Sequence, residues 1–448
     1  MMRILYDIIF IFFSLLYLPY MVFKGKLHGE LARRFALSSD LKFQAKSMAM
    51  SMGRPIWIHA VSVGEVRIAA LLVEALGKRS KKDIVVSTVT PTGNNLARRI
   101  LEKDITVIYA PLDLSFIVNK FVRSINPAIF LMMETELWPN LIYALHKKNI
   151  PIALINGRIS PASFKGYSKI KFITSKILPK ISLLCMQTEE DKKRIISLGA
   201  VVDKIKVTGS MKFDNKDDVI SDKEEYDYRL KLGICENDRL LIAGSTHPGE
   251  EEIILNIYKR LCFKFPNLKL LIAPRHPQRA PAIIKMAIRF DLEAMRFSFL
   301  NKHIRPLRQR CREGLSPWIN IDKDKKVVFV IDTIGHLNKL YKLASVVFIG
   351  GSLVERGGQN ILEPASFAKP IIFGPHMFNF SRIASLYLSH QAAIRVEAEE
   401  DLEAAIVRIL THPEDARKIG QRAKELIAQN KGAVERNLNL ITQLVKLH

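Results

Sequence analysis

The chain has 448 residues, of which 48% are hydrophobic, and ordinary glycine and proline contents. A chain of this length is too long to fold around one hydrophobic core, which predicts two domains of about 200 residues each. The composition excludes a disordered or fibrous protein. The net charge of +24 indicates a strongly anionic partner, such as nucleic acid, a phospholipid surface or a phosphorylated substrate. Four scattered cysteines lack CxxC spacing, so we expect reduced thiols and a cytoplasmic compartment: Cys185, Cys235, Cys262 and Cys311.

The N-terminal run Ile4–Phe23 is 20 residues long with Asp7 as its only charge, which approaches the length of a membrane-spanning helix. Cations follow directly: Lys24, Lys26, Arg33 and Arg34. By the positive-inside rule they hold the downstream chain in the cytoplasm, and no small-residue cleavage site follows. We therefore predict a retained anchor over residues 1–30, with the body of the protein on an anionic leaflet. Asp7 and Pro19 leave open a helix that lies in the membrane interface, and a buried core helix is the other alternative.

From Pro55 onward, apolar runs of strand length alternate with segments of helical period. The runs are, in chain order, PIWIHAV, DIVVSTV, TVIYAPL, PAIFLMM, PIALING, SLLCMQT, IKVTGS, RLLIAGS, LKLLIAP, KVVFVID, SVVFIGG and KPIIFGP. Such alternation predicts parallel sheets covered by helices on both faces.

A charged segment divides this series in two. Residues 215–231 are poor in apolar side chains and form the predicted linker. The first predicted domain covers residues 31–214 and the second covers residues 232–416, and both are expected to be doubly wound α/β folds. Residues 417–448 have a helical pattern that we expect to pack back across the first domain.

The stretch Val346–Pro375 alternates two apolar runs with a glycine-rich turn that opens a helix. Gly350–Gly351 permits a tight turn and the close approach of a ligand, and Gly357–Asn360 presents N–H groups at a helix start, which favours an anion site. Glu363, one turn into that helix, suits ribose hydroxyls. A plain tight turn between a strand and a helix is the alternative for this segment.

Polar residues follow many of the predicted strands, at the edge where open parallel sheets bind ligands. They are Ser62–Glu65, Glu134–Glu136, Asn156–Arg158 and Gly209–Lys212 in the first domain, and Gly244–His247 and Arg275–Arg279 in the second. We expect the two sets to face one cleft between the domains. The first set carries carboxylates, which suit proton abstraction from a hydroxyl, and the second carries cations, which suit a phosphate.

Glu65 is the first candidate base. It lies at a predicted helix start, where the helix dipole stabilises a charged carboxylate and keeps it available to accept a proton. A capping role is the alternative. Glu134 and Glu136 would point to opposite sides of a continued strand, so we expect only one of them to face the cleft.

The sequence gives little support for a metal centre. His247, His276 and His336 lack the i, i+4 spacing of a helical zinc motif, and no acidic pair follows a strand of the second domain. The chain also lacks a Walker loop and a GxSxG elbow. We therefore predict metal-independent catalysis without a cofactor. For the cation-rich stretch between Phe297 and Lys326 we favour a solvated loop over a contact with phosphates.

Six motifs occur in order and at compatible spacing. They are AVSVGEV (Ala60–Val66), METELWPN (Met133–Asn140), AGSTHPGEE (Ala243–Glu251), PRHPQR (Pro274–Arg279), GGSLVERGGQNILEPA (Gly350–Ala365) and FGPHMFNF (Phe373–Phe380). Together they resemble the bacterial Kdo transferases, which move 3-deoxy-D-manno-octulosonic acid (Kdo) from CMP-Kdo to a lipid A precursor. The resemblance implies a GT-B architecture at the inner membrane, in which two Rossmann-like domains face a central cleft, the first binding the acceptor and the second CMP-Kdo.

The resemblance also implies roles for residues. Glu65 would be the general base that deprotonates the acceptor hydroxyl, and Glu134 and Lys212 would support the transition state of an inverting transfer. The donor site would draw on Arg275, His276, Ile334, Gly335, His336, Asn360, Ile361, Leu362 and Glu363. The pattern of strand ends adds Ser245, Arg279, Gly351 and Ser352 to the same cleft.

Two positions depart from the family pattern, and two other functions stay open. Ser210 and His336 stand where the family usually has Asn and Glu; Ser210 keeps a hydrogen-bonding side chain, whereas His336 removes an acid from the donor region. One alternative is another membrane-associated GT-B sugar transferase, such as a lipid A disaccharide synthase. The other is a basic scaffold that binds lipopolysaccharide or nucleic acid without catalysis. Acidic strand ends argue against a nucleic-acid partner, because carboxylates repel polyanions.

Overall fold

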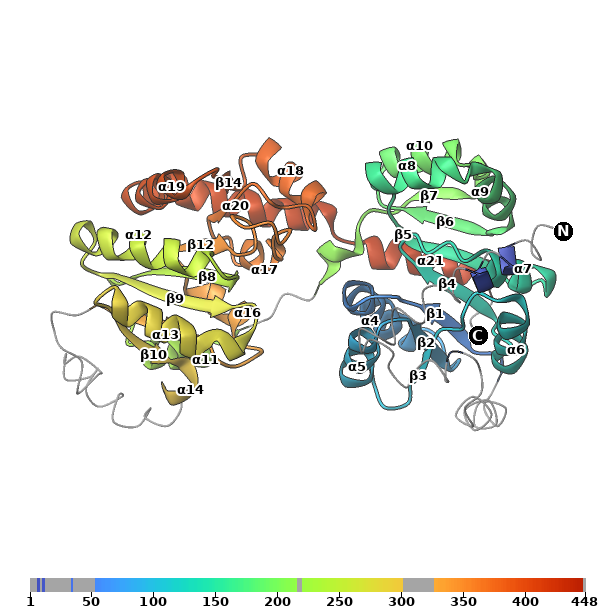
Figure 1. Cartoon of the computed structure of the whole chain (residues 1–448), viewed down its shortest axis with the longest axis horizontal. Coiled ribbons are helices and arrows are strands. Elements are labelled where there is room, and N and C mark those ends of the chain that lie inside the picture. The colour runs from blue at the N-terminus through green and yellow to red at the C-terminus, as the bar shows by residue number, and fades with distance from the viewer. Residues whose placement is uncertain are drawn as a thin grey trace. The chain divides into compact units, whose positions relative to one another are not determined.

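The structure, a computed structural model, describes residues 6–8, 10–12, 34, 53–215, 220–300 and 326–445. Two compact units make up the chain (Figure 1): unit 1 is Met1–Asn215 with Asn430–His448, and unit 2 is Lys216–Gln429. Most of the predicted anchor lies outside the described residues, and so do five cations of the stretch after Phe297: Lys302, Arg305, Arg308, Arg310 and Arg312. Among the helices that are described, none has the length and hydropathy needed to cross a bilayer.

Unit 1 alternates strands and helices around a parallel sheet. Its elements are β1 (Ile56–His59), α4 (Val63–Gly77), β2 (Ile84–Thr88), α5 (Pro91–Ile100), β3 (Thr106–Tyr109), α6 (Ser115–Ile125), β4 (Ile129–Met133), α7 (Pro139–Lys147), β5 (Ile152–Gly157), α8 (Pro161–Lys169), α9 (Lys171–Ile177), η1 (Leu178–Lys180), β6 (Leu183–Met186), α10 (Glu189–Ser197), η2 (Val202–Lys204), β7 (Ile205–Val207), η3 (Met211–Asp214) and α21 (Ala433–Leu444). The seven strands are ordered β3-β2-β1-β4-β5-β6-β7. The direction of winding therefore reverses between β1 and β4.

Unit 2 repeats this plan. Its elements are α11 (Asp222–Lys231), β8 (Arg239–Thr246), α12 (Glu250–Lys264), β9 (Leu268–Pro274), η4 (Pro277–Arg279), α13 (Ala280–Arg289), β10 (Glu293–Arg296), α14 (Phe297–Leu300), β11 (Val327–Val330), α16 (Leu337–Leu340), η5 (Tyr341–Leu343), β12 (Val346–Ile349), α17 (Leu362–Ser366), β13 (Ile371–Phe373), α18 (Ser381–Ser389), β14 (Ile394–Arg395), α19 (Glu399–Thr411) and α20 (Pro413–Asn430). Its seven parallel strands are ordered β10-β11-β9-β8-β12-β13-β14, with the reversal between β8 and β12. The prediction of two parallel, doubly wound α/β units is confirmed.

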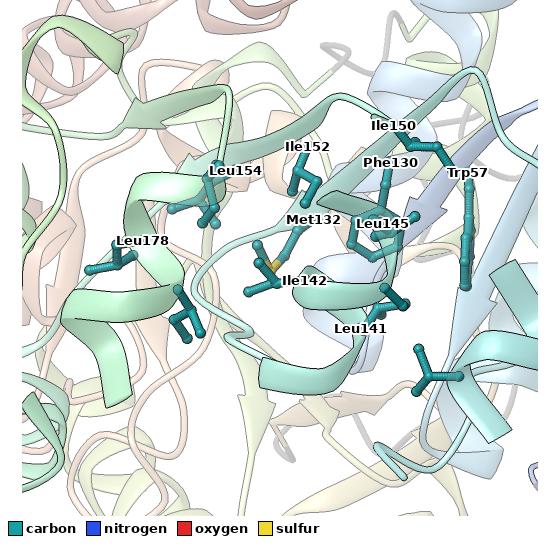
Figure 2. Close-up of a cluster of buried hydrophobic side chains, with 14 of the residues drawn as sticks. Trp57, Phe130, Met132, Leu141, Ile142, Leu145, Ile150, Ile152, Leu154 and Leu178 are labelled. Atoms are coloured by element: carbon teal, nitrogen blue, oxygen red, sulfur yellow. The ribbon is translucent and has the colours of Figure 1, made fainter. Parts of the chain in front are cut away.

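The core of unit 1 explains why the apolar runs form strands. Trp57 and Phe130, on the neighbouring strands β1 and β4, pack edge-on with a centroid distance of 4.9 Å, and α7 covers them with Leu141 and Leu145 (Figure 2). Ile56 and Ile58, the neighbours of Trp57 along β1, lie in a separate core cluster with residues of α4. Because successive side chains point to opposite faces, a strand buried on both faces must be apolar throughout.

Helix α11 lies within the segment predicted as a linker. It begins with a capping box, in which the hydroxyl of Ser221 accepts the N–H of Glu224 at 3.2 Å and the Glu224 carboxylate accepts the N–H of Ser221 at 3.1 Å. Tyr228 and Leu230 are buried. The capping box and these two buried residues stabilise a helix in a segment that we predicted as a linker because of its high charge content.

The C-terminal helix α21 belongs to unit 1. Ala433, Leu438 and Ile441 join the core cluster that contains the buried face of α4. Asp214, the last residue of η3, accepts the backbone N–H groups of Gly432 and Val434 at the start of α21. A carboxylate at this position satisfies free N–H groups and complements the helix dipole.

Candidate active site

The carboxyl ends of β1 and β4 flank the reversal point of unit 1, which is where open α/β sheets bind ligands. Glu65 lies in the first turn of α4 after β1, and Glu134 directly follows β4. The charges of Glu134 and Glu136 both act on Glu65, and the charge of Glu134 acts on Lys212 in η3. We call Glu65, Glu134 and Glu136 the carboxylate cluster, with Lys212 beside it.

Glu65 is held by the start of its own helix. Its side chain is 7% exposed, Oε2 accepts the N–H of Val61 at 2.8 Å, and Oε1 accepts the hydroxyl of Ser62 at 2.8 Å. The Ser62 hydroxyl in turn accepts the N–H of Glu65 at 3.4 Å. These are the contacts of a helix cap, so the capping role is present. Each carboxylate oxygen keeps a further lone pair with which to accept a proton.

Burial raises the pKa of Glu65 to about 7, and the charges of Glu134 and Glu136 also raise it, while the bonds from Val61 and Ser62 lower it. Desolvation outweighs both hydrogen bonds, so the carboxyl holds its proton more readily than its place at a helix start alone would suggest. A base with a pKa near the working pH transfers protons most effectively. The shift therefore suits a general base.

Glu134 has an uncommon backbone conformation, with φ at 51°. A residue with a side chain reaches this left-handed region only where its surroundings hold it there, often at functional sites. The N–H of Glu134 donates to the carbonyl of Ile155 at 2.9 Å. The turn ends β4, so side chains no longer alternate, and both Glu134 and Glu136 act on Glu65. The prediction that only one of them reaches the site assumed that the strand continues, and this condition is not met because β4 ends at Met133.

Neighbouring loops hold the turn after β4 in place. Thr135 donates its hydroxyl to the carbonyl of Arg158 at 2.6 Å, and the hydroxyl of Tyr167 donates to the carbonyl of Thr135 at 3.0 Å. The indole N–H of Trp138 donates to Glu136 at 3.2 Å. Burial raises the pKa of Glu136. Helix α8, which carries Tyr167, is thus tied to the turn that bears the carboxylates.

Lys212 is positioned from two sides. The amide oxygen of Asn156, a buried residue of β5 with φ at 56°, accepts the N–H of Met211 at 3.0 Å. Asp214 follows on the other side and binds α21. Burial lowers the pKa of Lys212, Glu134 opposes this shift, and Arg158 adds to it. The ammonium group therefore belongs to the same electrostatic neighbourhood as the carboxylate cluster.

In unit 2, cations gather around the carboxyl ends of β8 and β9. Burial lowers the pKa of His247, and the charges of four neighbours lower it further: Arg356, His276, Arg275 and Arg279. The rings of His247 and His276 lie 6.2 Å apart between centroids. We call Arg275, Arg279 and Arg356, together with the two histidines beside them, the cation cluster. Such a concentration of positive charge favours a phosphate.

Arg356 was missed by the sequence analysis. It lies in the glycine-rich loop, directly before Gly357, and it is the largest of the charged influences on the pKa of His247. A Cβ placed on Gly351 would lie 3.1 Å from the His247 ring and 3.3 Å from Cβ of Arg356. The loop therefore brings Arg356 beside the histidine. The sequence signal for this residue was the presence of an arginine within a glycine-rich loop of the type that binds phosphate.

Glu250 occupies part of the glycine-rich loop from within unit 2. The side chain is fully buried, and its two oxygens accept four backbone N–H groups: His247 at 2.9 Å, Gly351 at 2.7 Å, Ser352 at 3.0 Å and Leu353 at 3.1 Å. The N–H groups of Gly351, Ser352 and Leu353 are thus bound to a carboxylate of the same unit, whereas the N–H groups predicted to bind an anion are those of Gly357–Asn360. The loop at Gly351 and Ser352 is a structural nest in this conformation.

Several predicted donor-site residues have structural contacts. Ser352 is fully buried, and its hydroxyl donates to the carbonyl of Ile349 and accepts the N–H of Gly374 at 2.8 Å. Ile361 and Leu362 are buried core residues. We therefore place Ser352, Ile361 and Leu362 in the packing that supports the site.

Other predicted donor-site residues keep polar groups near the loop. Asn360 donates its amide N–H to Glu363 at 3.1 Å and accepts the N–H of Leu362 at 3.1 Å, which fixes the start of α17. Ser245 has φ at 58° where the register of β8 shifts. Arg279 donates to the fully buried Glu251 at 2.7 Å.

His336, the departure from the family pattern, packs against aromatic residues. Its Nδ1 lies 3.0 Å from the hydroxyl of Tyr228, and its ring centroid is 5.0 Å from that of Phe297. Burial lowers the pKa of His336. The preceding residues Ile334, which is 77% exposed, and Gly335, with φ at 96°, form an open turn.

No group of three or more His, Cys, Asp or Glu side chains is placed to hold a metal ion in the part of the chain that the structure describes. Cys185 and Cys262 are buried free thiols, and Cys235 is an exposed one. Metal independence stays a prediction.

Removing the charge of Arg356 is expected to raise the pKa of His247 toward its ordinary value, since Arg356 is the strongest of the charges that lower it. Arg356→Gln keeps a polar side chain of similar length. NMR titration of the histidine ring measures the change, and Arg408→Gln in α19 is the matched control. An unchanged pKa for His247 in Arg356→Gln would show that the two side chains do not share a site.

Two doubly wound parallel α/β units with charged groups at the carboxyl ends of their strands define a two-domain protein of the class that includes the GT-B glycosyltransferases. The glycosyltransferase from Rickettsia africae has this fold, with a TM-score of 0.56 over 88% of this chain and 99% of that one, at 14% identity. The family profile described as 3-deoxy-D-manno-octulosonic-acid transferase matches residues 30–215.

Two relatives extend the match. The chain is 35% identical to the 3-deoxy-D-manno-octulosonic acid transferase of Haemophilus influenzae over 86% of each protein. It is 36% identical to the bifunctional glycosyltransferase/methyltransferase of Fusobacterium nucleatum over 96% of this chain, and spans 62% of that protein's length. The chain belongs to the 3-deoxy-D-manno-octulosonic acid transferase family and is a glycosyltransferase. The resemblance noted in the sequence is confirmed.

Proposed function

We propose that the chain transfers Kdo from CMP-Kdo to a lipid A precursor at the cytoplasmic face of the inner membrane. Family membership supports the sugar and the reaction class. The observation that carries the catalytic assignment is the carboxylate cluster at the β1–β4 edge, where burial raises the pKa of Glu65 to about 7. In this proposal unit 1 binds the acceptor and unit 2 binds the donor through the cation cluster.

In the proposed reaction, an acceptor hydroxyl oxygen attacks the anomeric carbon of Kdo. The hydroxyl proton passes to Glu65, and the bond from the anomeric carbon to the phosphate oxygen of CMP breaks. Attack opposite to the leaving group inverts the configuration. CMP departs with the charge of a phosphate monoester, which the Arg275 guanidinium and a hydrogen bond from His276 stabilise.

Glu134 and Lys212 have complementary proposed roles. Positive charge develops at the sugar ring in the transition state, and the carboxylate of Glu134 stabilises it, as a carboxylate does in glycoside hydrolysis. Lys212 offsets the negative charge of the Kdo carboxylate. The charge of Glu134 raises the pKa of Lys212 and so opposes the effect of burial, which indicates that the two side chains lie near each other. This closeness supports a pair in which Glu134 acts on the positive sugar ring and Lys212 on the Kdo carboxylate.

Mass spectrometry of a lipid A precursor incubated with the full chain and CMP-Kdo tests the proposal. The expected result is a mass gain of one or more Kdo units with CMP-Kdo and none with UDP-sugars. Transfer from a UDP-sugar alone would assign the chain to a different glycosyltransferase reaction. Salt-sensitive DNA binding without any transfer would support the scaffold alternative.

Replacement of Asp214 tests how Lys212 is positioned. Asp214→Ala removes the carboxylate that binds Gly432 and Val434, so we expect a loss of about 0.5–2 kcal/mol in unfolding free energy and a lower kcat, with the KM for CMP-Kdo little changed. Asp214→Asn retains one accepting oxygen and should recover part of both. Urea unfolding and steady-state kinetics measure these effects.

The control for this experiment is Asp203→Ala, at an exposed position in η2. A kcat that stays at the wild-type value in Asp214→Ala, despite lower stability, would show that the cap does not position Lys212.

A further inference from the structure

The single charge in the apolar N-terminal run is bound to unit 1. Within Ile4–Phe23 this charge is Asp7. Its Oδ1 accepts the N–H of Ser115 at 3.1 Å and a side-chain amide N–H of Asn140 at 2.7 Å, and these residues lie 108 and 133 positions further along the chain. Phe10 packs on a core cluster of the same unit. The acid in this run therefore makes long-range contacts within the protein.

Asp7 supplies an acceptor to the start of helix α6. The N-cap residue of α6 is Leu114, whose hydrocarbon side chain cannot accept a hydrogen bond. The first N–H groups of a helix have no partner within the helix and need acceptors from outside it. The carboxylate of Asp7 accepts one of them, from Ser115, and its negative charge complements the helix dipole. The N-terminal segment is thus fastened to the start of α6.

The start of helix α7 is built in a similar way, and Asn140 joins the two helices. The N-cap residue of α7 is Trp138, whose indole ring carries a donor and no acceptor. Asp113 accepts the backbone N–H groups of Asn140 at 3.1 Å and Leu141 at 2.9 Å. The side-chain amide of Asn140, a fully buried residue, donates to the carbonyl of Asp113 and to Asp7, at 2.7 Å in both cases. The start of α7 is therefore bonded to the N-terminal segment.

Trp138 extends these contacts to the carboxylate cluster. It lies two residues before Asn140, and its indole N–H donates to Glu136 at 3.2 Å. The ring of His59, at the end of β1, meets the Trp138 ring edge-on at a centroid distance of 5.9 Å. Nδ1 of His59 in turn lies 2.9 Å from the hydroxyl of Ser87. A shift in the start of α7 would therefore move the donor that holds Glu136.

We propose that Asp7 is a positioning residue for the carboxylate cluster. Asp7 fixes the start of α7 through the side chain of Asn140. Trp138, at that start, holds the carboxylate of Glu136, whose charge acts on Glu65. The N-terminal run thus contributes to the site through the start of α7, without a group that touches a substrate.

A local role as the cap of α6 does not account for both hydrogen bonds of Asp7. Such a cap needs only the N–H of Ser115, whereas the shorter of the two bonds goes to the side chain of Asn140. A half-buried carboxylate also costs desolvation free energy that an apolar residue in this run would not. Two directed hydrogen bonds offset that cost and define where the N-terminal segment lies on α6 and α7.

Fluorine NMR of the full chain labelled with fluorotryptophan tests the structural part of the proposal without any substrate. The resonance of Trp138 is assigned from Trp138→Phe. It should move in Asp7→Ala and keep its wild-type position in Asp7→Asn, because the amide oxygen can accept the same two N–H groups. The resonance of Trp57, a fully buried residue of β1, should stay in place in both variants and show that the core is intact. An unmoved Trp138 resonance in Asp7→Ala would overturn the proposal.

The kinetic part rests on the proposed function. Asp7→Ala should lower the kcat of Kdo transfer by up to about 10²-fold, as misplacement by a remote mutation can, and leave the KM for CMP-Kdo little changed. The pH midpoint of transfer should also fall, because the charge of Glu136 raises the pKa of Glu65 and a displaced Glu136 raises it less. Asp7→Asn should retain the wild-type kcat and midpoint. Equal losses in the two variants would contradict a role that depends on the accepting oxygen.

Ser221→Ala is the matched control for a lost helix cap. It breaks the capping box of α11 in unit 2, so it should lower stability but leave the pH midpoint and the Trp138 resonance unchanged. If Asp7→Ala behaves as Ser221→Ala does in both measurements, Asp7 is only a local cap and the proposal fails. If the proposed function is wrong, none of the variants transfers Kdo, but the Trp138 resonance still moves in Asp7→Ala.

Discussion

Replacement of Glu65 by glutamine is expected to lower the rate of Kdo transfer by about 10²–10⁴-fold, the usual contribution of general base catalysis, while CMP still binds. The amide has no basic oxygen to take the acceptor proton. It can keep the cap, because its oxygen can accept the N–H of Val61 and its NH₂ can donate to the hydroxyl of Ser62. Single-turnover kinetics and calorimetric titration with CMP measure the two properties separately.

The stability of this variant distinguishes a base from a structural residue. Burial raises the pKa of Glu65 from 4.5 to about 7, so the folded state disfavours the charged form relative to the unfolded chain. The protonated Glu65 carboxyl therefore contributes to the free energy of unfolding fully below pH 4.5, and this contribution is lost as the pH rises through about 7. Glu65→Gln should therefore be at least as stable as the wild type at alkaline pH, with Glu74→Gln in the same helix as the control. Loss of CMP binding together with transfer would assign Glu65 a structural role.

Replacement of Glu250 by alanine is expected to lower the unfolding free energy of unit 2 by about 3–5 kcal/mol. Alanine leaves four buried N–H groups, from His247 and the loop at Gly351–Leu353, without the carboxylate that accepts them. Each such group costs free energy when it has neither a partner nor water. Urea unfolding measures the loss, and weaker CMP binding should accompany it because the loop also carries Arg356.

The neighbouring Glu252 provides the control for this experiment, since it is an exposed acid in the same first turn of α12. Glu252→Ala should change the unfolding free energy by no more than about 0.5 kcal/mol. Equal effects of Glu250→Ala and Glu252→Ala would contradict the role given to the buried carboxylate.

The sequence predicted most strands of both sheets because a strand buried on two faces is a continuous apolar run. It missed β10 (Glu293–Arg296) and β14 (Ile394–Arg395), which lie at the edges of the second sheet. Both are short, and both include a charged residue that an edge position tolerates. Helix α11 was taken for a linker, because its stability comes from a capping box and two buried residues and not from an apolar stripe.

The strand-end pattern predicted the position of Glu65, but not its electrostatics. Its burial comes from packing that spacing in the sequence does not report, and this burial moves the pKa of Glu65 to about 7. Likewise, Glu136 acts on Glu65 because the backbone turns at Glu134, with φ at 51°. Local periodicity assumes a regular strand and cannot express such a turn.

In unit 2 the glycine-rich loop was predicted to offer its N–H groups to an anion. Glu250, which lies 101 residues before Gly351, binds the N–H groups of Gly351, Ser352 and Leu353 at the start of this loop. A carboxylate at a helix start looks like an ordinary cap in sequence, and only the meeting of β8 and β12 at the centre of the sheet brings it to the loop. The histidines and arginines after β8 and β9, by contrast, were predictable, because parallel strands end at one edge.

The pH dependence of single-turnover transfer tests the central claim, that the Glu65 carboxylate takes the acceptor proton. Because only the ionised form accepts a proton and burial raises the pKa of Glu65 to about 7, the account predicts a rate that rises with pH, tenfold per unit on the acid side, and levels off above a midpoint near 7. The small residual rate of Glu65→Gln should lack this rise. A wild-type rate that is flat across neutral pH, or the same rise in Glu65→Gln, would contradict the account.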